Sequence, residues 1–137
     1  MIRRSISQCI VVAIDAKKVL NNKWEVFTHG GRNKTGIDSV EFAKQVEDNG
    51  AGEILLTSID QEGTSKGFDC ELIESVTTAV DLPLLASGGF GSLDDIEKIS
   101  KLDVDGLVIA DAIHFNKIDL SLIREKAKKL GLKVRNF

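Results

Sequence analysis

Polar residues that could do chemistry stand at the ends of four apolar runs in this sequence. Each run ends in, or is followed by, one of them: Asp15, Asp60, Ser87 and Asp111. A carboxylate within hydrogen-bond reach of a substrate can transfer a proton, so Asp15 and Asp60 are candidates for acid or base catalysis. The alternative for Asp15 is a structural ion pair with Lys17, because a carboxylate beside an apolar run must be either exposed or paired.

A glycine-rich turn is the second chemical feature. Ser87-Gly88-Gly89 joins an apolar run to a helical pattern that begins at Ser92. Glycine lets the backbone approach an anion closely, and a helix N-terminus adds positive partial charge, so this order is typical of phosphate sites. An ordinary strand-to-helix turn would use glycine for its geometry alone, and the spacing by itself leaves both interpretations open.

Size and charge limit the class of protein. The 137 residues, of which 42% are hydrophobic and 28% charged, suffice for one globular domain with its own core. A net charge of −3 argues against a nucleic-acid-binding surface. No segment reaches the ~20 apolar residues that a membrane span needs. The apolar run that follows Arg3 and Arg4 is too short for a signal peptide and is predicted to be a buried strand.

Cysteine and histidine usage predicts neither a metal site nor a cofactor. Cys9 and Cys70 lie far apart without C-x-x-C spacing, so we expect two buried thiols in a cytoplasmic protein. His29 and His114 have no cysteine or carboxylate at ligand spacing.

Strand and helix patterns alternate along the chain and predict the elements that position these residues. Strands are expected near residues 9–15, 53–60, 83–87 and 106–111. Helices are expected at 38–49, 69–80, 92–102 and 119–130, the first with a capping box of Asp38 and Glu41. A short hairpin that turns at Asn21-Asn22 interrupts the pattern, and residues 29–36 are expected to form an exposed, mobile loop.

This order predicts an α/β fold of four strand–helix units over residues 1–137, with parallel strands and right-handed crossovers. Two architectures fit, an open doubly wound sheet or half of a (β/α)8 barrel. Polar residues at the carboxyl ends of the strands favour the half-barrel, because barrels assemble their active sites at that end. Four units leave two sheet edges unpaired, so we expect the chain to need a partner.

Several motifs resemble, in order and spacing, the C-terminal half of the cyclase subunit of imidazole glycerol phosphate synthase. They are Val-Val-Ala-Ile-Asp-Ala-Lys (11–17), Thr-His-Gly-Gly-Arg (28–32), Gly-Ala-Gly-Glu-Ile-Leu-Leu-Thr-Ser-Ile-Asp (50–60), Gly-Thr (63–64) and Ala-Ser-Gly-Gly (86–89). The resemblance implies a (β/α)8 barrel of two similar halves, each with one phosphate site. It also implies a substrate with two phosphates, which ammonia from a glutaminase subunit cleaves and cyclises. The products are imidazole glycerol phosphate and an aminoimidazole carboxamide ribotide.

The resemblance also assigns roles near the first two strands. Asp15 matches one of the two aspartates that act as acid and base in this family. The other aspartate belongs to the N-terminal half, which has no counterpart in this sequence. Asp60 would assist catalysis, and the expected substrate contacts are Thr57, Gly63 and Thr64.

The phosphate site implied by the resemblance consists of Ser87, Gly88 and Gly89 with the backbone of Ala110 and Asp111. The family commonly has a serine where Asp111 stands, and a carboxylate beside a phosphate is electrostatically unfavourable. Either the Asp111 side chain turns away, or this site is weaker than in the family.

Two further positions have alternative interpretations. Glu53, at the start of a strand, matches the ring through which ammonia enters the barrel, and its alternative is a surface salt bridge. The family usually has aspartate where Glu62 stands, which leaves the role of Glu62 open.

The sequence therefore favours half of an ammonia-dependent cyclase in the cytoplasm, with a possible glutaminase partner and a second copy in a homodimer or higher even oligomer. The alternative is a self-associating half-barrel that binds phosphate and has little or no activity. The isomerase of the same pathway is a third interpretation, against which residues 28–31 and 50–60 favour the cyclase.

Overall fold

The structure is a computed structural model that describes residues 9–135, so the predictions for Arg3 and Arg4 lie outside the described part. Strands and helices alternate after an N-terminal hairpin. The elements are β1 (Val11–Leu20), β2 (Lys23–Thr28), β3 (Asn33–Asp38), α2 (Ser39–Asp48), β4 (Glu53–Ser58), α3 (Cys70–Thr77), β5 (Leu84–Ser87), α4 (Leu93–Ile99), β6 (Gly106–Val108), α5 (Asp111–His114) and α6 (Leu120–Lys129).

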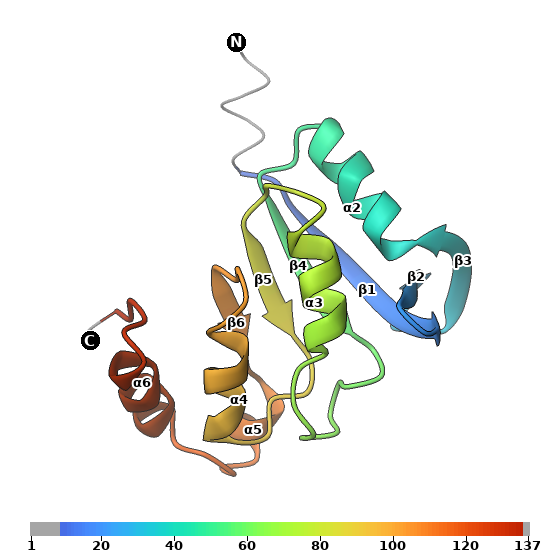
Figure 1. Cartoon of the computed structure of the whole chain (residues 1–137). Coiled ribbons are helices and arrows are strands. Elements are labelled where there is room, and N and C mark those ends of the chain that lie inside the picture. Colours follow the sequence, from blue (N-terminus) through green and yellow to red (C-terminus); the bar gives the residue numbers. More distant parts are fainter. Residues whose placement is uncertain (1–8, 136–137) are drawn as a thin grey trace.

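The strands form one open sheet in the order β3-β2-β1-β4-β5-β6. β1, β4, β5 and β6 are parallel, whereas β2 and β3 extend the sheet as antiparallel strands. Figure 1 shows α2, α3 and α4 on the same side of this sheet. The predicted α/β fold is therefore confirmed, and the open sheet of four strand–helix units is consistent with a partial barrel.

The two faces of the sheet differ in burial. On the side of the helices, Ile14, Ile54 and Leu84 are fully buried in the core. Successive residues of a strand point to opposite faces, so Ala13 and Leu55 belong to the other face. Ala13 is exposed and Leu55 is only half-buried there. A partly apolar sheet face is thus left open to the surroundings in the described part of the chain.

Helix starts follow the sequence closely. Asp38 Oδ1 accepts hydrogen bonds from the Val40 and Glu41 backbone N–H groups, 2.9 and 3.1 Å away, at the start of α2. The predicted capping box is wrong, because the Glu41 carboxylate pairs with Lys44 Nζ at 2.8 Å instead of reaching back. Asp69 and Asp119 cap α3 and α6 in the same way as Asp38 caps α2.

Residues 29–36 do not form the predicted loop throughout, because Asn33–Asp38 is strand β3, paired with β2. The Thr35 hydroxyl donates to the Val26 carbonyl at 2.6 Å and fixes this strand. β1 also continues past its predicted end at Asp15, because it runs on into the hairpin with β2.

β4 and β6 are shorter than predicted at their carboxyl ends, whereas β5 ends at Ser87 as predicted. β4 ends at Ser58, because the chain turns at residues 59–64, and β6 ends at Val108, shortly before α5 begins at Asp111. The short helix α5 therefore stands where no helix was predicted.

The prediction of two buried thiols is wrong for Cys9, which precedes β1 and is exposed. Cys70 is half-buried at the start of α3, and burial raises the pKa of its thiol above the ordinary value. Both cysteines are free. Among residues 9–135, the helices are too short and too polar to cross a membrane.

Candidate functional site

Strand register places three of the predicted site residues side by side across the sheet. Asp15 in β1 is the partner of Thr57 in β4, and Thr57 is the partner of Ser87 in β5. Neighbouring strands lie about 4.8 Å apart, so this row spans about 10 Å from Asp15 to Ser87. The row lies on the open face, near the carboxyl ends of the parallel strands. A small substrate could touch all three residues at once.

Asp15 is half-buried in this row, with Phe27 of β2 as its partner on the other side. The alternative of an ion pair with Lys17 is not realised, because Lys17 Nζ lies over the Phe27 ring, 5.6 Å from its centroid. Within the described residues, the Asp15 carboxylate has no ion pair and no hydrogen bond. It is therefore available to a substrate on the open face.

Asp60 is held by the backbone of β1. Its Oδ2 accepts a hydrogen bond from the Lys18 N–H at 2.7 Å, which ties the loop after β4 to the end of β1. The Lys18 side chain pairs with Glu71 at 2.7 Å, and this hydrogen bond raises the pKa of Lys18 above its ordinary value. Asp60 thus has a structural role that the sequence did not reveal.

The glycine turn after β5 packs against the loop that follows β4. A side chain at Gly88 would lie 2.7 Å from the Ser58 carbonyl oxygen, and one at Gly89 would overlap the Gly67 carbonyl. The Gly67 N–H also donates to the Gly89 carbonyl at 2.7 Å. Close packing by itself therefore explains both glycines, and phosphate binding at this turn stays a prediction.

The start of α4 is already occupied by a carboxylate of this chain. Asp95 Oδ2 accepts hydrogen bonds from the Gly91 and Ser92 N–H groups, both at 2.9 Å. The Gly91 and Ser92 N–H groups are therefore not available to a phosphate. This contact leaves out the Ser87-Gly88-Gly89 turn and the end of β6, where a phosphate site stays a prediction.

A small pocket lies between that turn, the loop after β4 and the start of α5. Its volume is about 20 Å³, which is room for about one water molecule. A phosphate would therefore sit mainly in its mouth. The pocket is lined by Glu62, Gly63, Ser65, Ser87, Gly88, Gly89, Phe90, Val108, Ile109, Ala110, Asp111 and Ala112.

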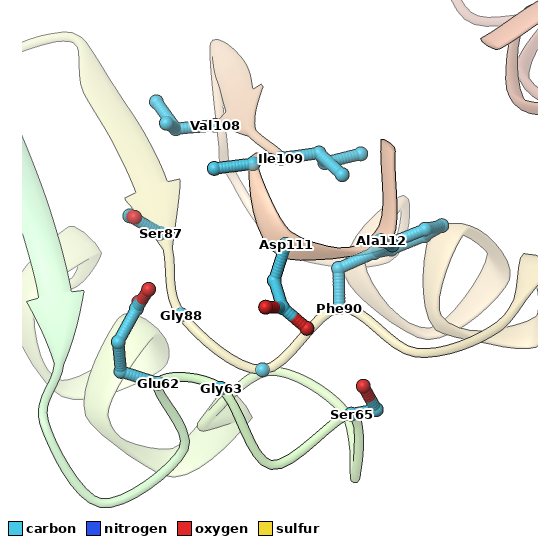
Figure 2. Close-up of a pocket in the computed structure, with 12 residues that line it drawn as sticks. Glu62, Gly63, Ser65, Ser87, Gly88, Phe90, Val108, Ile109, Asp111 and Ala112 are labelled. Carbon is cyan, nitrogen blue, oxygen red and sulfur yellow. The ribbon is translucent and has the colours of Figure 1, made fainter. Parts of the chain in front are cut away.

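Two carboxylates make this pocket unusual for an anion. Figure 2 shows the side chains of Glu62 and Asp111 directed into the space between the surrounding loops. Asp111 Oδ2 forms an ion pair with Lys117 Nζ at 2.7 Å, and Lys117 Nζ also lies 3.3 Å from Ser65 Oγ. The Asp111 side chain therefore does not turn away. Sequence reasoning missed Lys117 and Ser65, because nothing in their spacing marks them as neighbours.

The remaining predicted site residues lie at both ends of the parallel strands. Gly63, Thr64 and Ala110 are near the carboxyl ends, and Glu53 is at the amino ends. Gly63 lines the pocket, whereas the Thr64 hydroxyl donates to the Gln61 carbonyl at 2.8 Å within its own loop. Ala110 immediately precedes α5. Glu53 begins β4, in register with Val11, and so lies at the amino end of the strands, away from Asp15. The described part of the chain shows no ion pair for Glu53.

The described residues contain no group of three or more histidine, cysteine, aspartate or glutamate side chains that could hold a metal ion. The chemistry available at this end of the sheet is therefore that of an unpaired carboxylate, a hydroxyl and a pocket with one neighbouring lysine.

Comparison with known families agrees with this arrangement. Residues 1–119 match the family described as histidine biosynthesis protein, whose members are (β/α)8 barrels. The matched range includes the row from Asp15 to Ser87, the residues that line the pocket and Lys117. The open sheet accordingly corresponds to part of such a barrel. This chain belongs to the histidine biosynthesis protein family.

Proposed function

We propose that this chain is one half of an imidazole glycerol phosphate synthase cyclase, with Asp15 as its general acid or base. The observation that carries the proposal is the row in which an unpaired Asp15 lies about 10 Å from Ser87 on the same sheet face. A phosphate held near Ser87 would place the rest of a phosphorylated substrate over Thr57 and Asp15. Membership of the histidine biosynthesis family supports this substrate class.

In this proposal each predicted residue has a defined task. The backbone of Gly88, Gly89, Ala110 and Asp111 holds one phosphate of the substrate together with Ser87. Thr57, Gly63 and Thr64 contact the substrate between the phosphate and the reacting atoms. These atoms lie over Asp15, which transfers a proton while ammonia cleaves and cyclises the substrate.

In this proposal Asp60 and Glu53 have separate roles at opposite ends of β4. Asp60, fixed by the Lys18 N–H, keeps the end of β1 in register with the loop after β4 and assists Asp15. Glu53 lies at the amino end of the strands, where ammonia from a glutaminase subunit would enter. We place this chemistry in the cytoplasm, in keeping with the two free cysteines.

The partner that completes the barrel is a second four-unit half, either a second copy of this chain or a matching N-terminal half. The open face carries exposed apolar residues, with Val11 53% and Val108 39% accessible. An apolar groove of about 530 Å³ also lies beside β6, between α4 and α6. Burial of these surfaces against a second half would contribute about 25 cal/mol per Å² of apolar area.

The experiment combines this chain with a matching N-terminal half and measures ammonia-dependent turnover of the bis-phosphorylated ribonucleotide. We expect turnover that Asp15→Asn abolishes and that Asp48→Asn, at the exposed end of α2, leaves unchanged. Absence of turnover with every partner half and at every ammonia concentration would refute the cyclase.

A second candidate function is a self-associating half-barrel that binds phosphate without turnover. The exposed apolar face supports this candidate, because two copies could bury it against each other. Phosphate binding by an even-numbered assembly, together with no activity in the combined experiment, would favour this candidate over the cyclase.

A further inference from the structure

We propose that Lys117 is a phosphate ligand, held beside the pocket by Asp111 and Ser65, two residues that line it. Asp111 would then support anion binding through Lys117 instead of opposing it. The inference rests on the proposed phosphate site and extends it by a residue to which the family resemblance assigns no role.

The backbone turn after α5 sets the position of Lys117. The chain reverses there, since Asn116 has a positive φ of 53° and the Lys117 N–H donates to the Ala112 carbonyl at 2.8 Å. This turn brings Lys117 back beside the start of α5, where Asp111 lies. The position of the lysine is thus set by the backbone as well as by its side-chain contacts.

Two residues that line the pocket hold the ammonium group. Its Nζ is 2.7 Å from Asp111 Oδ2 and 3.3 Å from Ser65 Oγ. These two contacts come from different sides of the pocket, one from α5 and one from the loop after β4. The same Nζ also lies over the Phe115 ring, 5.6 Å from its centroid.

One N–H donor of the Lys117 ammonium group is left for a ligand. A lysine ammonium has three N–H donors. Asp111 and Ser65 engage two of them, so the third can donate to a phosphate oxygen in the mouth of the pocket. The side chains of Lys117 and Asp111 are 45% and 31% accessible, so the pair is not sealed from a ligand.

The two carboxylates at the pocket explain why a phosphate would need a lysine there. Glu62 and Asp111 both line the pocket, and each carboxylate by itself repels a phosphate. The ammonium group of Lys117 neutralises Asp111 and adds an attractive contact for the anion. In its absence the pocket would carry two negative charges next to the bound phosphate.

The test measures binding of inorganic phosphate by isothermal titration calorimetry at constant ionic strength, with the folding of each variant checked by circular dichroism. Loss of a charge-assisted hydrogen bond predicts that Lys117→Met weakens binding by about 10-fold or more. The matched control is Lys44→Met, which also removes a lysine from an exposed ion pair but lies on α2. We expect the control to bind phosphate as the wild type does.

Asp111→Asn should change the phosphate affinity in opposite directions with and without Lys117. In the wild-type background this change replaces the charged partner of Lys117 by a neutral amide, which holds the ammonium group less firmly, and should weaken phosphate binding. In the Lys117→Met background it removes a bare repulsive charge and should strengthen binding. Should the Asp111 variants fail to fold, Ser65→Ala provides the second test, with weaker binding expected only while Lys117 is present.

Each other outcome overturns the inference. If wild type binds phosphate and Lys117→Met binds equally well, Lys117 is not a ligand and the proposed site stands without it. If Asp111→Asn strengthens binding in both backgrounds, Asp111 merely repels the anion. If wild type binds no phosphate, the proposed phosphate site and this inference both fail.

Discussion

At the scale of single residues, the carboxylates near the carboxyl ends of the strands differ in what they contact. Asp60 is engaged by the Lys18 N–H and Asp111 by Lys117. Within the described residues, Asp15 alone of these three has no such partner. The Asp15 carboxylate is therefore the one of the three that is free to contact a ligand on the open face.

Gly89 gives the sharpest prediction about a single residue. Gly89→Ala should destabilise the fold by about 3 kcal/mol, since the new Cβ would overlap the Gly67 carbonyl at a φ of 105°. The matched control Gly63→Ala has positive φ too but nothing within 4 Å, so strain alone should cost about 1 kcal/mol. Urea unfolding measures both. Equal losses would show that the loop after β4 does not pack on the turn as described.

Burial of Cys70 predicts a difference between the two thiols. The thiolate is the reactive form, and burial raises the pKa of Cys70, so Cys70 should react slowly at neutral pH. The exposed Cys9 should react first with a thiol reagent such as 5,5′-dithiobis(2-nitrobenzoate). Cys9→Ser and Cys70→Ser variants assign the two phases. A fast phase that survives Cys9→Ser would contradict the prediction.

At the scale of secondary-structure elements, capping residues also join elements together. Asp69 Oδ1 accepts from the Leu72 N–H at 3.0 Å and caps α3, while its Oδ2 accepts from the Trp24 indole N–H at 2.9 Å. One carboxylate therefore fixes the start of a helix and the position of the β1–β2 hairpin. The hairpin packs on the helix layer through Trp24, which is only 2% exposed.

Asp69→Ala should lower the free energy of unfolding by about 2 kcal/mol, because the helix loses its cap and the buried indole N–H loses its acceptor. Asp69→Asn keeps an N-cap oxygen and should cost less than half as much. Trp24 is the only tryptophan, so its fluorescence follows unfolding directly. Equal losses for asparagine and alanine would show that the carboxylate charge, and not the cap oxygen, matters here.

The contact between α4 and α6 predicts a dependence on pH. Lys126 Nζ lies 3.0 Å from Glu97 Oε2, and this hydrogen bond lowers the pKa of Glu97 below its ordinary value. A lowered pKa in the folded state stabilises the fold above the ordinary value of a glutamate. That contribution is lost as the pH falls through the lowered value.

Glu97→Gln should therefore be less stable than wild type at pH 7, and the difference should disappear as the pH falls through the lowered pKa of Glu97. Urea unfolding at a series of pH values measures this difference. In a Lys126→Met background the same change should have no such pH dependence. A difference that increases as the pH falls would have the wrong sign for this ion pair.

At the scale of the whole molecule, the open sheet is the dominant feature. β2 pairs with β1 only from Asp15 onward, so the first half of β1 has no neighbour on that side within the described residues. β6 forms the opposite edge of the sheet. A second half could pair with both edges and cover the exposed apolar face, which is how a barrel closes.

Light scattering on a sizing column tests this closure. We expect the wild-type chain to form an even-numbered assembly, which Val11→Asp should dissociate, because it places a charge on the open face beside Glu53. Leu20→Asp, at the exposed tip of the hairpin, should leave the mass unchanged. A monomeric wild-type chain would indicate that a separate N-terminal half is the partner.

The sequence by itself determined where most of the strands and helices lie and which residues begin three of the helices. Apolar runs, capping aspartates and glycine turns act locally, so the starts of α2, α3 and α6 at Asp38, Asp69 and Asp119 were predictable. The alternation of strand and helix in turn determined the parallel α/β fold. Strand β3 was missed, since its residues are polar and gain their order from pairing with β2.

Only the tertiary structure decided which residues meet at the site. Register aligned Asp15, Thr57 and Ser87 in one row, and packing of the loop after β4 brought Ser65 to Lys117 across 52 residues. It also brought the Asp95 carboxylate to the Gly91 and Ser92 N–H groups just before α4. Such contacts depend on distances between segments far apart in the chain, which local sequence patterns do not encode.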